Sequence, residues 1–153
     1  MQDFQRLEEI FSDARKRMAL NGNPDQWKDN RPSMALVKRD IQEGHSYVIE
    51  ENDRIVATFA CLPGVEKTYL KIDGKWLDDE EYVTIHRIAS DGSVKGVFEA
   101  ALEFAESFKK DVRIDTHKDN KPMLHIMEKY GFVYCGIILV DDGSQRLAFQ
   151  KKI

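Results

Sequence analysis

The strongest constraint on the fold lies in the middle of the chain, where two strand-then-helix units follow one another between residues 82 and 132. The apolar run Tyr82–Ala89 predicts a mostly buried strand, and a helix with one apolar face is expected over about 94–109. A second strand at 112–116 and a helix from 122 to 130 repeat the arrangement.

The flanking segments supply further helices and hairpins. Patterning predicts helices at 3–20 and 32–43, strands at 45–50 and 54–62, a short strand at 69–72 before a turn at Asp73-Gly74, and a final hairpin of 132–140 and 146–152. This order predicts an α/β fold with a mixed sheet and helices on its faces.

Composition narrows the class of protein. A chain of 153 residues is expected to form a single domain, 1–153, and its net charge of -4 argues against non-specific binding to nucleic acid. No apolar run approaches the roughly 20 residues of a membrane span, and the polar start does not resemble a signal peptide. Cys61 and Cys135 lie in apolar runs and read as buried thiols, so a reduced, cytoplasmic protein without membrane partners is expected.

Four short motifs occur in a characteristic order. They are His86-Arg87-Ile88-Ala89-Ser90, Lys95-Gly96-Val97, the run Arg113–Asn120, and Tyr130-Gly131-Phe132. Together they resemble the GNAT superfamily of acyl-coenzyme A-dependent N-acetyltransferases over residues 45–152. The resemblance implies a largely antiparallel central sheet with helices on both faces and a splayed parallel strand pair at its centre.

The same resemblance implies a reaction. An acetyl or other acyl group would pass from acetyl-CoA, as co-substrate, directly to a primary amine of a small molecule, peptide or protein. No His pair combines with a Cys or carboxylate at metal spacing, so no metal is expected.

The chain also departs from the family pattern. Ser93 stands where the pyrophosphate motif has Arg or Gln, Phe98 stands where it has Gly or Ala, and the loop between Ser90 and Gly96 is short. No strand is visible before the first helix. These departures leave open an alternative function, a non-catalytic acyl-CoA-binding or regulatory module on the same fold.

By resemblance, the cofactor would lie across two neighbouring features of the fold. The pantetheine arm would take hydrogen bonds from backbone groups between the splayed strands, as an added strand does. The pyrophosphate would meet amides at a helix start, where N–H groups are unpaired and the dipole is positive. The expected cofactor-binding residues are Ile88, Ala89, Ser90, Lys95, Gly96, Val97, Phe98 and Asn120. Close packing at Gly96, a plain surface role for Lys95 and a helix N-cap at Asn120 are the alternatives.

Three residues are candidates for the proton transfers. Tyr130 is the candidate general acid for the leaving thiolate, with packing beneath the hairpin as the alternative. His86 on the central strand and Glu81 at its start are candidate bases. The alternatives are a satisfied sheet histidine and a solvated carboxylate.

The acceptor site is the least constrained part. Its lining is expected from residues 20–35 and 63–81, with Trp27 either one wall or a plug beneath a loop. The acidic run Asp78–Glu81 could attract a cationic amine or simply be solvated. Exposed edges of the final hairpin could pair two chains into a homodimer.

Overall fold

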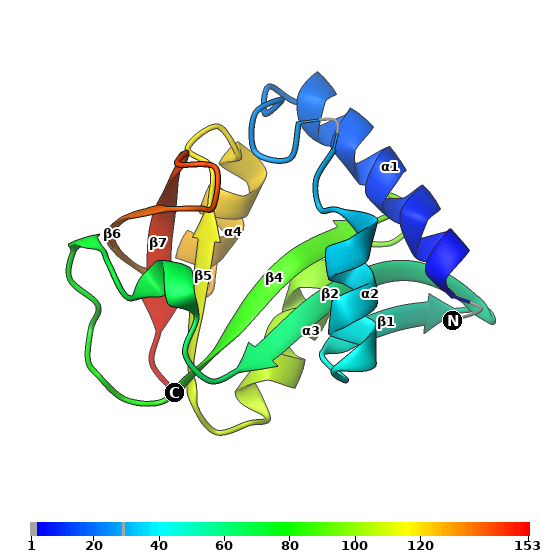
Figure 1. Cartoon of the computed structure of the whole chain (residues 1–153). Helices are drawn as coiled ribbons and strands as arrows, with labels where there is room; N and C mark the ends of the chain where they lie inside the picture. Colours follow the sequence, from blue (N-terminus) through cyan, green and yellow to red (C-terminus); the bar gives the residue numbers. More distant parts are fainter. Residues whose placement is uncertain (1–2, 29) are drawn as a thin grey trace.

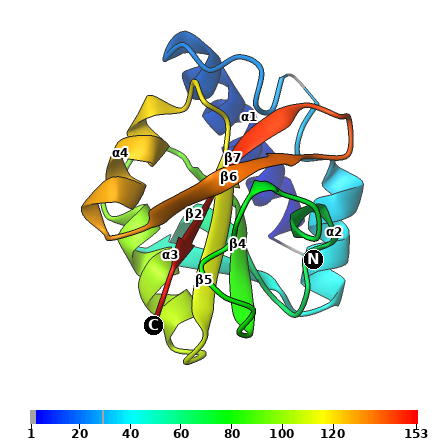
Figure 2. The same ribbon diagram turned by 90° about the vertical axis from the view of Figure 1, so that its left-hand side faces the viewer.

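A seven-stranded mixed sheet forms the centre of the molecule, with two helices on each face (Figures 1 and 2). The computed structural model describes residues 3–28 and 30–153. The helices are α1 (Phe4–Leu20), α2 (Met34–Gln42), α3 (Val97–Glu106) and α4 (Lys121–Lys129), with a short 3-10 helix η1 (Lys67–Tyr69). The strands are β1 (Ser46–Glu51), β2 (Arg54–Pro63), β3 (Asp73–Gly74), β4 (Tyr82–Ser90), β5 (Asp111–Thr116), β6 (Val133–Leu139) and β7 (Gln145–Lys151).

The order of strands across the sheet is β1-β2-β4-β5-β7-β6-β3, and β4–β5 is its parallel pair. The predicted fold class, a largely antiparallel sheet with a parallel pair at its centre, is therefore confirmed. In the part of the chain that the structure describes, no strand precedes α1, so β1 forms this edge of the sheet. None of the described helices is both long and apolar enough to cross a bilayer.

Two apolar clusters cover the two faces of the sheet. On one face, α3 and α4 pack on β2, β4 and β5 through residues such as Leu102, Met127 and Ile85. On the other face, α1 and α2 pack on β2 and β4 around Phe11. Trp27 meets Phe11 edge-on at 5.8 Å between ring centroids, which matches the predicted aromatic plug under a loop.

The prediction for the connection between β2 and β4, residues 64–81, was wrong in its details. Residues 67–69 form η1 in place of the expected strand at 69–72, and Asp73-Gly74 is a two-residue strand paired with β6 in place of a turn. A close backbone approach explains the difference. A Cβ on Gly74 would lie 2.2 Å from the carbonyl oxygen of Cys135, and one on Gly136 would lie 2.3 Å from that of Asp73. Because neither facing glycine has a Cβ, the backbone of β3 can lie this close to β6 and pair with it.

The parallel pair is very short. β4 and β5 are in register only from Tyr82 opposite Asp111 to Thr84 opposite Arg113. Beyond this point the two strands diverge, as Figure 1 shows. From Ile85 to Ser90, the edge of β4 that faces β5 has no strand partner in the described residues.

A bulge in β4 lies within the diverging part. Along β2, Thr58 and Ala60 are two residues apart, whereas their partners Ala89 and His86 are three apart. The extra residue is Arg87, whose φ of 55° lies in the left-handed region. A bulge bends its strand and increases the local twist, so it helps to turn β4 away from β5.

The contact between Gly74 and Gly136 can be tested by adding a methyl group. Gly136→Ala should lower the free energy of unfolding by about 1–3 kcal/mol, because the new Cβ meets backbone atoms. Gly143→Ala is the control, since Gly143 also has positive φ but no atom within 4 Å of an added Cβ. Urea unfolding of both variants measures the difference, and equal losses would contradict the role of this contact.

Candidate functional site

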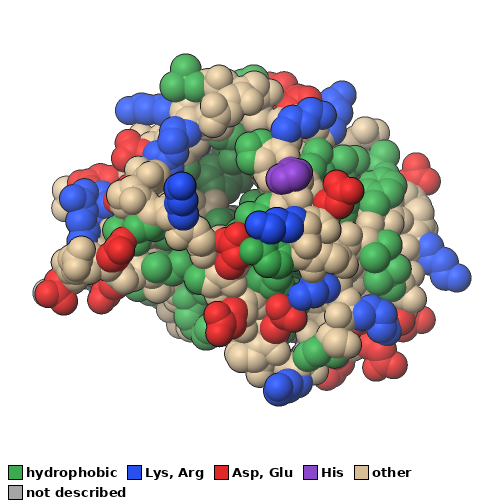
Figure 3. Space-filling view, turned by 180° about the vertical axis from the view of Figure 1, so that it is seen from behind, with side chains coloured by type: hydrophobic (Ala, Val, Ile, Leu, Met, Phe, Trp, Pro, Cys, Tyr) green, Lys and Arg blue, Asp and Glu red, His purple; other side chains and the backbone are tan. Residues whose placement is uncertain are grey.

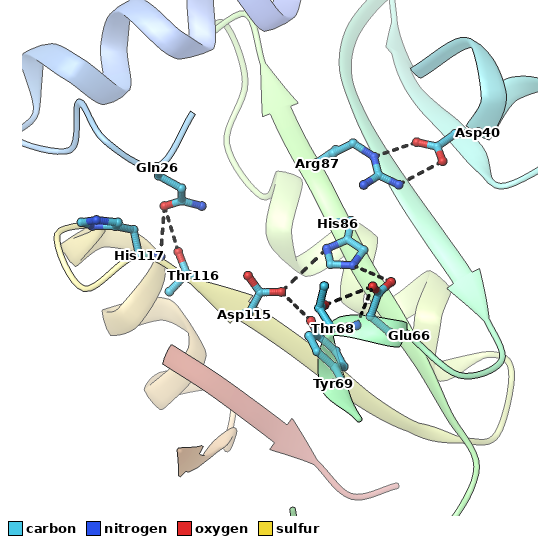
Figure 4. Close-up of polar contacts among 10 residues, drawn as sticks. All are labelled: Gln26, Asp40, Glu66, Thr68, Tyr69, His86, Arg87, Asp115, Thr116 and His117. Carbon is cyan, nitrogen blue, oxygen red and sulfur yellow. Dashed lines mark hydrogen bonds and ion pairs between the residues drawn. The ribbon is translucent and has the colours of Figure 1, made fainter. Parts of the chain in front are cut away.

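Titratable side chains converge where β4 and β5 diverge. His86 comes from β4, Asp115 from the end of β5, and Glu66, Thr68 and Tyr69 from the segment around η1 (Figure 4). We call these five residues the front cluster, because they lie on the sheet face opposite α3 and α4. Ile85, the neighbour of His86 along β4, packs toward those two helices.

His86 lies between two carboxylates. Its Nε2 atom is 3.3 Å from Oε2 of Glu66, and its Nδ1 atom is 4.0 Å from Oδ2 of Asp115. The three side chains are 19%, 23% and 10% exposed, so solvent screens these contacts only in part. Each nitrogen of the imidazole ring therefore has a carboxylate oxygen near it.

Glu66 is held as an ionised group. Its hydrogen bond with His86 is the largest cause that lowers the pKa of Glu66, to about 2, against the opposing effect of burial. Thr68 also donates to Oε1 of Glu66, from its backbone N–H at 3.4 Å and its hydroxyl at 3.1 Å. Glu66 consequently stays negative at any pH near neutrality.

Asp115 is anchored by a buried tyrosine. The hydroxyl of Tyr69, a residue only 2% exposed, donates to Oδ2 of Asp115 at 2.7 Å. Burial, followed by the charge of Asp115, raises the pKa of Tyr69 well above its ordinary value. Trp76 in turn donates to the Tyr69 carbonyl at 3.0 Å. Tyr69 therefore acts as a fixed neutral donor to Asp115.

The start of α3, where the sequence predicted a pyrophosphate site, is open to solvent. Gly96 is the N-cap with φ of 80°, and both Lys95 and Gly96 are exposed. A surface depression is lined by residues 93–97, Ala100 and residues of β1 and β2. The ring of Phe98 is buried, with its centroid 6.1 Å from those of Tyr130 and Phe132, so its bulk lies in the core.

The loop between β4 and α3 is tied to α1. Arg6 forms an ion pair with Asp91 at 2.7 Å, and the Arg17 guanidinium donates to the Ser90 carbonyl. Of the expected backbone partners, Ala89 pairs with Thr58 of β2, and the Ile88 side chain packs on the α3–α4 side. Seen from that side, the molecule is hollowed near its middle, with hydrophobic side chains in the hollow (Figure 3).

Asn120 has two structural roles. Its Oδ1 atom accepts from the backbone N–H of Met123 and caps α4, while its Nδ2 atom donates to Oε1 of Gln26 at 3.1 Å. The same Gln26 oxygen accepts from the Thr116 hydroxyl and the His117 N–H, each at 3.2 Å. The loop after α1 is thereby fastened to the end of β5, a contact that no sequence pattern indicated.

The three candidate catalytic residues do not meet. The Tyr130 hydroxyl donates to Oε1 of Glu99 at 3.0 Å on the α3–α4 side, and this hydrogen bond is the main cause that raises the pKa of Tyr130. Glu81 is 82% exposed and pairs with Lys110 at 3.4 Å. It precedes His86 by five residues, about 16 Å along a strand. Of the three, only His86 belongs to the front cluster.

The acidic run Asp78–Glu81 lies, like Lys110, at the end of β4 that pairs with β5. The carboxylate of Asp78 contacts Lys152 and Gln150, and the backbone carbonyl of Asp78 accepts from Arg113. These contacts hold Asp78 against β5 and β7, at the opposite end of β4 from the divergence. The structure therefore gives no support to the run as the mouth of a site beside His86.

The described residues include one group with ligand atoms close enough for a metal ion, within 4.8 Å of one another: Asp25, His117 and Asp119. It lies in the loops beyond the end of β5. Nδ1 of His117 already accepts from the Asp119 N–H at 3.1 Å. None of the three residues belongs to the front cluster.

Comparisons with known proteins place the chain among acetyltransferases. An acetyltransferase of the GNAT family from Streptococcus agalactiae is 32% identical, with a TM-score of 0.87 over 99% of this chain and 91% of that one. A GNAT-family acetyltransferase from Listeria monocytogenes is 17% identical, with a TM-score of 0.73 over 99% and 90%. The NatC complex bound to Gag peptide and CoA contains a chain that is 12% identical, with a TM-score of 0.61 over 95% and 92%. No family model and no curated protein matches the chain.

The ionised Glu66 predicts a pH-dependent contribution to stability. Its pKa is about 2 in the folded protein and 4.5 ordinarily, so its contribution is present above the higher value and is lost as the pH falls toward the lower one. Glu66→Gln should therefore be less stable than wild type at neutral pH, and the difference should shrink as the pH falls from about 5 to about 3. Urea unfolding across this range measures it. The control is Glu8→Gln, at an exposed position on α1, and a pH-independent difference for Glu66→Gln would contradict the assignment.

Proposed function

The chain belongs to the GNAT family of acetyltransferases, and on this premise we propose that it transfers an acetyl group from acetyl-CoA directly to a primary amine. The observation that carries the proposal is the position of His86. It stands between two carboxylates at the point where the parallel strands diverge. A basic nitrogen at this place can take the proton that the amine must lose.

The proposed cofactor site uses both ends of the loop after β4. The pantetheine arm lies between β4 and β5, where backbone groups of Ile88 to Ser90 are expected to serve it. The pyrophosphate meets the amides of residues 95–98 at the start of α3, and Lys95 adds a positive charge. Asn120 supports this site indirectly, because it caps α4 and fastens the loop after α1.

The proposed proton path needs no second titratable group. The amine nitrogen attacks the thioester carbonyl carbon, its proton passes to His86, and the carbon–sulfur bond breaks. The departing thiolate then takes the proton back from His86. Glu66 and Asp115 stabilise the imidazolium that exists between the two transfers. Amine and acetyl-CoA thus become amide and free coenzyme A.

Two tyrosines are the alternative candidates for the role of acid. Tyr69 is buried and its hydroxyl is committed to Asp115, while Tyr130 is hydrogen bonded to Glu99. Both have raised pKa values, which makes each a weaker acid toward a thiolate of reference pKa near 8.5. This comparison favours His86 as the proton donor.

Replacement of His86 tests the proposal. His86→Gln should lower kcat by about 10²–10⁴-fold, because general base catalysis is lost, without a change in the Kd of acetyl-CoA. Calorimetry with acetyl-CoA and a thiol-release assay over a panel of primary amines give the two quantities. His125→Gln is the matched control, since His125 is exposed on α4.

The same measurements separate the other outcomes. No binding at millimolar acetyl-CoA would refute the enzyme assignment. Binding without turnover on any amine would favour a binding or regulatory module. Lys95→Glu should weaken acetyl-CoA binding and leave kcat unchanged at saturation, because Lys95 is assigned to the pyrophosphate alone.

Tyr130→Phe tests which residue protonates the thiolate. If His86 returns the proton, this variant should keep the kcat of the wild type, since it loses only the hydrogen bond to Glu99. A fall of about 10²-fold or more at unchanged acetyl-CoA affinity would instead assign the proton donor to Tyr130. Tyr134→Phe, at an exposed position on β6, is the control.

A further inference from the structure

The bulge in β4 is held by a residue that does not favour its conformation. Arg87 has φ of 55°, in the left-handed region, which residues other than glycine adopt at a steric cost. Such a conformation persists only when the surrounding structure holds it in place. The question is therefore what holds Arg87.

A bidentate ion pair with α2 supplies the restraint. Nε of Arg87 donates to Oδ2 of Asp40 at 2.7 Å, and an Nη atom donates to Oδ1 at 2.9 Å (Figure 4). The two side chains are 15% and 6% exposed. A charge-assisted fork of this kind restricts orientation as well as distance.

Asp40 is itself well fixed. It is one of the two buried residues of α2, and the other, Val37, packs in the apolar cluster beneath α1 and α2. Its carbonyl accepts from the N–H of His45 at 2.8 Å, just before β1. The helix therefore provides a rigid base for the Arg87 side chain.

Arg87 lies between two residues that the proposed reaction needs. His86 precedes it and faces the front cluster, and Ile88 follows it on the side of α3 and α4. In a strand without the bulge, side chains would alternate strictly, and a shift by one residue would exchange the faces of Ile88 and Ala89. The bulge thus sets which backbone groups face the pantetheine slot, and it begins directly after His86, whose backbone it adjoins.

We propose that Arg87 and Asp40 are positioning residues of the acyl-transfer site, which hold the left-handed bulge and thereby place His86 and the Ile88 backbone. This inference rests on the proposed function. It means that α2, which contributes no residue to the front cluster, affects the rate of the reaction through the contact of Asp40 with Arg87.

Two variants remove the ion pair in different ways. Asp40→Asn keeps the shape of the side chain and removes its charge, and Arg87→Gly accepts positive φ but has no side chain to anchor. Each should lower kcat by about 10-fold or more, because a small displacement of a catalytic group is enough for such a loss. The double variant should be no slower than the slower single variant, since both changes break one interaction.

A control separates positioning from stability. Ile10→Val in α1, at a fully buried position, should lower the midpoint of unfolding without lowering kcat. Unchanged kcat in both Asp40→Asn and Arg87→Gly, with a stability loss like that of Ile10→Val, would overturn the inference. Retained activity in Arg87→Gly alone would also overturn it, because the backbone angle would then suffice without the ion pair.

A measurement that does not depend on turnover separates failure of the positioning role from failure of the proposed function. The nitrogen chemical shifts of the His86 ring should change in both variants and stay unchanged in Ile10→Val. If the wild type acetylates no amine, the proposed function fails, and these shifts alone decide whether the ion pair positions His86. If the wild type is active and the shifts do not move, only the positioning role is refuted.

Discussion

The shape of the sheet at its centre depends on how early the hydrogen-bonded ladder between β4 and β5 ends. Three residues of each strand pair, and then the strands separate while β4 continues for six more residues. Backbone N–H and C=O groups in the middle of a protein need hydrogen-bond partners, and a divergent strand leaves them to be satisfied by something else. A ligand that carries amide groups of its own, such as pantetheine, meets this need in the way that an added strand would.

The divergence also divides the proposed work between the two faces of the sheet. The proposed pyrophosphate site at Gly96 and the hollow seen in Figure 3 lie on the side of α3 and α4, whereas the front cluster is built largely from the connection that contains η1. That connection has little helical structure to stiffen it. The connection is held in place by β3, which pairs with β6 through two facing glycines. A contact at the far edge of the sheet thus supports Glu66 and Tyr69.

Much of the fold could be predicted from the sequence, because hydrophobic periodicity and glycine or proline punctuation report local structure. The same signals could not place η1 or β3, whose conformations depend on contacts with β6 more than 60 residues away in sequence. Among the residues of the front cluster, the sequence made His86 a candidate, but it did not indicate Glu66, Asp115 or Tyr69, since these side chains converge only after the sheet has formed. Glu81 lies far from His86, because five residues of an extended strand span about 16 Å. The bulge at Arg87 was not predicted, because a strand with a bulge and a regular buried strand give the same apolar sequence pattern.

The front cluster places a carboxylate near each nitrogen of the His86 ring, which suits the proposed role of His86 as the base. Hydrogen bonds from His86 and Thr68 lower the pKa of Glu66 and keep it ionised, and Tyr69 donates to the Asp115 carboxylate. When the ring of His86 takes a proton, the charge that it gains lies between two opposite charges already in place, so little reorganisation is needed. In the proposed reaction the amine approaches from the face of His86, because the proposed cofactor path takes the other face. On this proposal the thioester carbon would lie in the gap between β4 and β5, where the amine could reach it from one side of the sheet and coenzyme A from the other.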